Sequence, residues 1–234
     1  MYVSTSSSDR ENLFRAIRFE SPDYIPMTFH INDACWSFYP QEDLQQLIES
    51  HKLLFPNYTL HELPYTPVYD DVARAAEPYT DDFGCVWHTS RDGIVGCVTE
   101  HPLENWENYT DYVFPNPEIS TGLRSIDWND FEQDIAAQKR NGLMTYGDLR
   151  HGHTFQQAAD IRGYFNLCCD MADEEPLLYD LLNRICDLIW HRLTTSLKRM
   201  WILSGFPKIL VCRPDRWSLR TSSGQFSSHA TEKW

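Results

Sequence analysis

The sequence predicts an α/β fold, because helix-like and strand-like patterns alternate along its 234 residues. Apolar residues recur at helical spacing in several stretches, and short apolar runs separate these stretches. Such alternation favours a parallel sheet. A hydrophobic content of 42%, with 14% aromatic residues, suffices for a buried core and excludes a disordered chain.

The N-terminal third predicts two helices with a strand between them. Ser8 or Asp9 can cap a first helix over residues 9–19. Residues 24–31 contain β-branched and aromatic side chains and predict a short buried strand. A second amphipathic helix is expected over residues 41–51.

A hairpin is the next predicted feature. Residues 85–89 and 94–99 are strand-like, and Asp92-Gly93 lies in the turn between them. Asp-Gly between two such runs is a strong hairpin signal. The remaining elements are predicted as helices over 127–139, 154–162, 164–171 and 176–198, with strands at 143–146 and 201–204.

Charge and composition restrict the partners and the compartment. The formal net charge of −14 argues against nucleic acid as a partner. We expect no membrane span, since no run of about 18 apolar residues occurs. The Ser-rich N-terminus has no signal-peptide pattern, and the seven scattered cysteines are typical of reduced thiols. A cytoplasmic location is therefore expected.

The C-terminal stretch differs in composition from the rest. Residues 198–234 carry seven Lys and Arg against two Asp and Glu, within an otherwise acidic chain. Apolar periodicity also stops near Met200. We therefore treat residues 204–234 as an aberrant basic, Ser/Thr/Arg-rich tail that follows a main unit of residues 1–203.

Three blocks of sequence together carry a family resemblance. They are Asn12-Leu-Phe-Arg-Ala16 with Asp23-Tyr-Ile-Pro26, then Asp81-Asp-Phe-Gly-Cys-Val-Trp87 with His101-Pro-Leu103, then Gly152 to Gly163 with Asp170-Met171 and Glu175-Pro176. In order and spacing, over about residues 9–203, they resemble the uroporphyrinogen decarboxylase superfamily. That superfamily also contains cobalamin-dependent methyltransferases.

The resemblance implies a (β/α)8 TIM barrel with an N-terminal helical extension, with its site at the C-terminal ends of the strands. A whole barrel needs about 250 residues, so an incomplete barrel is expected here. A reading of Met200–Gln225 shifted by two nucleotides can encode D-L-G-M-Q followed by S-P, which resembles the family's next strand and loop. We therefore expect residues after about Lys198 to come from a frameshift.

The resemblance favours the methyltransferase branch over true decarboxylases. The decarboxylases hold substrate carboxylates with arginines of an M-R-Q-A-G-R motif, and Ile31 and Cys35 stand at those arginine positions. The family's catalytic Tyr would fall near Ala159 or Asp160 and is missing. Zinc and cobalamin are cofactors of the methyltransferase branch, but its H-x-C…C zinc ligands lie late in the barrel and none is identifiable here.

Candidate site residues follow the predicted strands. His30, Asn32 and His151 are the catalytic candidates, and Asp148, Arg150, His153, Asp81 and Trp87 are the substrate-binding candidates. For His30 a structural role is the alternative, and for Asp81 and Trp87 a capped turn and a packed indole. His151-Gly-His153 could supply two metal ligands, but without a third we assign no metal.

The expected function is that of a uroporphyrinogen decarboxylase superfamily member, closer to corrinoid-linked methyl transfer than to porphyrinogen decarboxylation. Its partners would be a small-molecule substrate and a corrinoid protein. Because the late-barrel loops are missing, we expect this chain to be inactive, although its family is enzymatic. The alternative is a non-catalytic binding or self-associating protein, for example a homodimer, built on a partial barrel.

Overall fold

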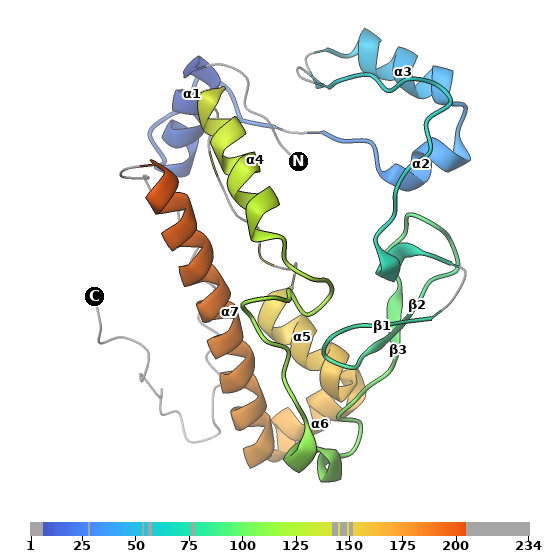
Figure 1. Cartoon of the computed structure of the whole chain (residues 1–234), viewed down its shortest axis with the longest axis vertical. Coiled ribbons are helices and arrows are strands. Elements are labelled where there is room, and N and C mark those ends of the chain that lie inside the picture. Colours follow the sequence, from blue (N-terminus) through green and yellow to red (C-terminus); the bar gives the residue numbers. More distant parts are fainter. Residues whose placement is uncertain are drawn as a thin grey trace.

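The computed structural model describes residues 7–204 except 28, 53, 56–57, 76–77, 142–144, 146–148 and 150–151. It is a mixed helix-and-sheet structure (Figure 1). The site candidates Asp148, Arg150 and His151, all of the strand expected at 143–146 except Thr145, and the tail from residue 205 onward lie outside the described residues. None of the helices within the described part is both long enough and apolar enough to cross a membrane.

The elements follow one another in a largely helical order. They are α1 (Ser7–Ile17), α2 (Asp33–Phe38), α3 (Gln41–Ser50), η1 (Asp71–Ala73), β1 (Tyr79–Thr80), β2 (Val86–His88), β3 (Cys97–Glu100), η2 (Trp106–Asp111), α4 (Trp128–Arg140), α5 (His153–Arg162), α6 (Tyr164–Asp173) and α7 (Pro176–Ser204). The helices predicted at 9–19, 41–51, 127–139, 154–162 and 164–171 are confirmed within a few residues.

The predicted hairpin is confirmed. Strands β1, β2 and β3 form an antiparallel sheet in that order, with Trp87 opposite Val98 and His88 opposite Cys97. Trp87 is buried on this sheet. The strands within the described part are all antiparallel, so the parallel sheet that the alternation favours is not seen there.

The buried strand predicted at 24–31 is wrong for the residues described there. They form no strand, and Ile25 and Met27 are 77% and 68% exposed. Pro26 removes a backbone donor from the middle of this run, which disfavours strand pairing. Instead the chain passes as an extended segment from α1 to α2 (Figure 1).

Helix α7 is longer than predicted and replaces the strand expected at 201–204, which is wrong. Between Lys198 and Ser204 no Gly or Pro interrupts the helix, and propagating an existing helix is easier than starting a new element. Its buried stripe, Leu178, Leu181, Ile185 and Leu188, has helical spacing. Helix α7 packs against α4, α5 and α6 (Figure 1).

The apolar residues form two cores. The larger core joins the sheet to α5, α6 and α7 and includes the fully buried Cys85, Leu103 and Ile161. The smaller core packs Trp36 of α2 against Leu44 and Ile48 of α3. The N-terminal helices α2 and α3 therefore have a core of their own.

A buried ion pair ties the larger core together. Arg162 at the end of α5 donates from Nε to Asp170 Oδ2 at 2.7 Å, and these residues are 7% and 8% exposed. Arg162 Nη1 also donates to the carbonyl oxygens of Leu103, at 2.8 Å, and Glu104. Trp106 Nε1 donates to Asp170 Oδ1 at 3.2 Å, and its indole lies against the guanidinium. Both charges are thus compensated inside the protein, as burial requires.

We predict that Asp170→Asn lowers the free energy of unfolding by about 3–5 kcal/mol, because the Arg162 guanidinium would stay buried without a counter-charge. Urea denaturation measures the change. The control is Asp70→Asn, which removes the partner of Arg124 from an exposed pair at 2.9 Å and should cost about 0–1 kcal/mol. Equal losses for the two variants would contradict the structural role of the buried pair.

Candidate functional site

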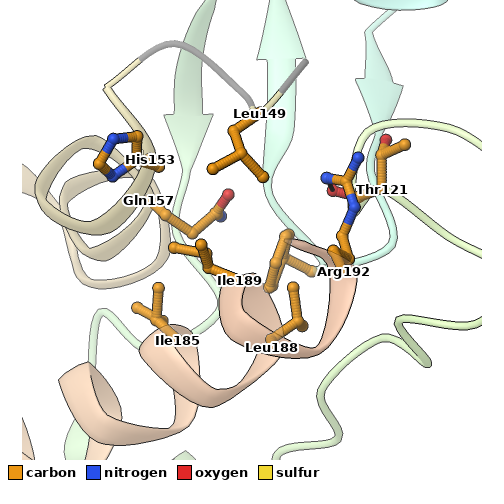
Figure 2. Close-up of a pocket in the computed structure, with 9 residues that line it drawn as sticks. Thr121, Leu149, His153, Gln157, Ile185, Leu188, Ile189 and Arg192 are labelled. Carbon is orange, nitrogen blue, oxygen red and sulfur yellow. Dashed lines mark hydrogen bonds between the residues drawn. The ribbon is translucent and has the colours of Figure 1, made fainter. Parts of the chain in front are cut away.

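A pocket lies between the first turns of α5 and the middle of α7 (Figure 2). It encloses about 330 Å³, including space open to solvent. Most of this volume is open to solvent, and the enclosed part has room for only about one water molecule. The residues that line it are Phe83, Thr121, Leu149, His153, Gln157, Ile185, Leu188, Ile189 and Arg192. Apolar walls with a few polar groups are typical of ligand sites.

Helix spacing explains how α7 contributes to the pocket. Leu188, Ile189 and Arg192 follow Ile185 by three, four and seven positions, so they lie on one face of the helix. From α5, His153 and Gln157 are four residues apart and share a face in the same way. The two helices pack together and therefore bring these faces to one place.

Arg192 is the charged group of the pocket. Its Nη1 donates a long hydrogen bond of 3.5 Å to the carbonyl oxygen of Thr121. Its Nε is buried, and no described residue accepts a hydrogen bond from it. Burial, and to a lesser extent the neighbouring positive charge of Arg124, lowers the pKa of Arg192 from its ordinary value. Among the described residues, the pocket therefore holds a guanidinium with one long hydrogen bond and no ion pair.

Of the substrate-binding candidates, His153 lines the pocket. It is half-buried and begins α5, after Gly152 with a φ of 71°. Figure 2 shows its imidazole on the α5 side, with Arg192 and Thr121 on the opposite side. Its Nδ1 lies 3.5 Å from Thr154 Oγ1. His153 is thus placed to contact a ligand at the edge of the pocket.

Asp81 and Trp87 are brought together, but as parts of the hairpin. Asp81 is 4% exposed, and its Oδ1 accepts from the backbone N–H groups of Phe83, at 3.0 Å, and Cys85, at 2.9 Å. Its Oδ2 accepts from Trp87 Nε1 at 2.8 Å. This is the arrangement of a capped turn with a packed indole. Their neighbour Phe83, not these two residues, reaches the pocket.

The catalytic candidates His30 and Asn32 lie elsewhere. Both are exposed, and Asn32 Oδ1 accepts from Ala34 N at 2.8 Å, which caps α2. Figure 1 shows α2 apart from α5, so the structure does not bring Asn32 together with His153. The third catalytic candidate, His151, lies outside the described residues, as do Asp148 and Arg150 on either side of the pocket residue Leu149.

Sequence reasoning missed Thr121, Gln157 and Arg192. Arg192 lies within a long amphipathic helix, where a single arginine looks like part of a solvated face. Thr121 contacts it across 71 positions of sequence, which no local pattern reveals. Gln157 is a buried polar residue on a face of α5. Its spacing of four residues from the candidate His153 could have indicated that the two share a face.

A metal site needs at least three ligand side chains in one place. Within the described ranges no group of three or more His, Cys, Asp or Glu side chains is arranged to hold a metal ion. The ligand set of the zinc-dependent methyltransferases is therefore not found among the residues that the structure describes.

Comparison with family models, with curated proteins and with solved structures finds no match to this chain.

We predict that Asp81→Ala lowers the free energy of unfolding by about 3 kcal/mol, because three buried N–H groups lose their acceptor. Urea unfolding measures this. The control is Asp111→Ala, at an exposed carboxylate, which should stay within about 0.5 kcal/mol of the unaltered chain. A stable Asp81→Ala protein would instead show that the carboxylate is not needed for the fold and would revive a binding role.

Proposed function

We propose that this chain is a divergent member of the uroporphyrinogen decarboxylase superfamily, of the methyltransferase-like branch, and that it binds a small molecule in the pocket between α5 and α7. We propose that its fold is an incomplete (β/α)8 barrel with an N-terminal helical extension. The single observation that carries the proposal is that two of the resemblance blocks, about 60 positions apart, pack into one unit.

The contacts between these blocks are specific. His101 Nδ1 lies 2.7 Å from the carbonyl oxygen of Asp160, and Cys85 Sγ donates to the same oxygen at 3.3 Å. Gly163, with a φ of 84°, lies so close to His101 that an added Cβ would meet its Cδ2 at 3.2 Å. The Arg162-Gly163 pair of the motif thus has a physical role: one residue pairs with Asp170 and the next permits a close approach.

The pocket supports a small substrate better than a porphyrinogen. Uroporphyrinogen carries eight carboxylates on a macrocycle, which is far larger than the enclosed part of this pocket. Among the described lining residues Arg192 is the only arginine or lysine. Eight carboxylates would meet too little positive charge there. We therefore favour a corrinoid-linked methyl transfer over decarboxylation. His30, Asn32 and His151 remain the catalytic candidates, and zinc enters no part of the proposal.

The test of this proposal restores the reading frame. We expect the nucleotide sequence after Lys198, read two nucleotides later, to encode the family's next strand and loop. The chain with the restored frame should transfer a methyl group from methylcobalamin to a thiol. The change in absorbance of the cobalamin measures this transfer. The 234-residue chain should show no turnover, and neither chain should decarboxylate uroporphyrinogen. Turnover by the 234-residue chain, or related genes that encode the same tail in frame, would refute the proposal.

A second candidate function is self-association, and one specific observation favours it. Large apolar side chains are exposed on the segment between α1 and α3, including Phe19 at 95% and Ile25 at 77%, together with Met27, Phe29 and Phe38. Exposed apolar side chains gathered on one segment are typical of interaction surfaces. A non-catalytic binding protein would use this surface.

For this second candidate we predict that the purified chain elutes above its monomer mass, measured by size-exclusion chromatography with light scattering. The double variant Ile25→Ser with Phe29→Ser should shift it towards the monomer. The matched control, Val113→Ser, changes an exposed apolar side chain outside this segment and should have no effect. A monomeric unaltered chain would exclude self-association.

A further inference from the structure

We draw no further inference here: the strongest candidate, the exposed apolar segment between α1 and α3, is already the surface of the self-association candidate, and nothing among the described residues shows what covers it.

Discussion

The rest of the structure depends on the buried ion pair between Arg162 and Asp170. It joins the end of α5 to α6 and to the turn that precedes η2. The backbone carbonyl of Asp170 also accepts from Glu175 N at 2.9 Å, which fixes the point where α7 can start. The pair does not line the pocket, but it helps to fix where α5 ends and α7 begins, and these two helices form the pocket. Removing either partner would leave the other charge buried without compensation.

Two buried carboxylates and the partly buried Arg192 differ in how far the described residues satisfy their hydrogen bonds. Both carboxylate oxygens of Asp170 and of Asp81 accept hydrogen bonds from donors within the protein. Arg192 differs, because its Nε lacks an acceptor among the described residues. A buried charge whose hydrogen bonds are satisfied within the protein stabilises the fold. By this criterion Asp81 stabilises the hairpin, and Asp170 stabilises the contact between α5 and α6.

Local signals predicted much of the fold, and contacts distant in sequence account for what they missed. Asp92-Gly93 predicted the hairpin, and helical spacing predicted α3, α4 and α5, because turn chemistry and periodicity are encoded locally. The six-residue α2 was missed because it is too short to show a helical period; its capping residue is Asn32, which is also one of the catalytic candidates. The pocket was only partly predictable. His153 could be predicted because it follows a predicted strand, whereas the position of Arg192 depends on its neighbours Thr121 and Arg124, which are distant in sequence.

The two proposed activities can be separated because they use different cores. The pocket is built on the larger core, through Phe83, Ile185 and Leu188. The exposed apolar segment leads instead into α2 and α3, which pack around Trp36. Since neither core contributes residues to the other, a surface change at Ile25 should leave the pocket intact, and substitutions far apart generally act independently. Self-association and ligand binding are therefore compatible, because the exposed segment and the pocket are separate parts of the structure.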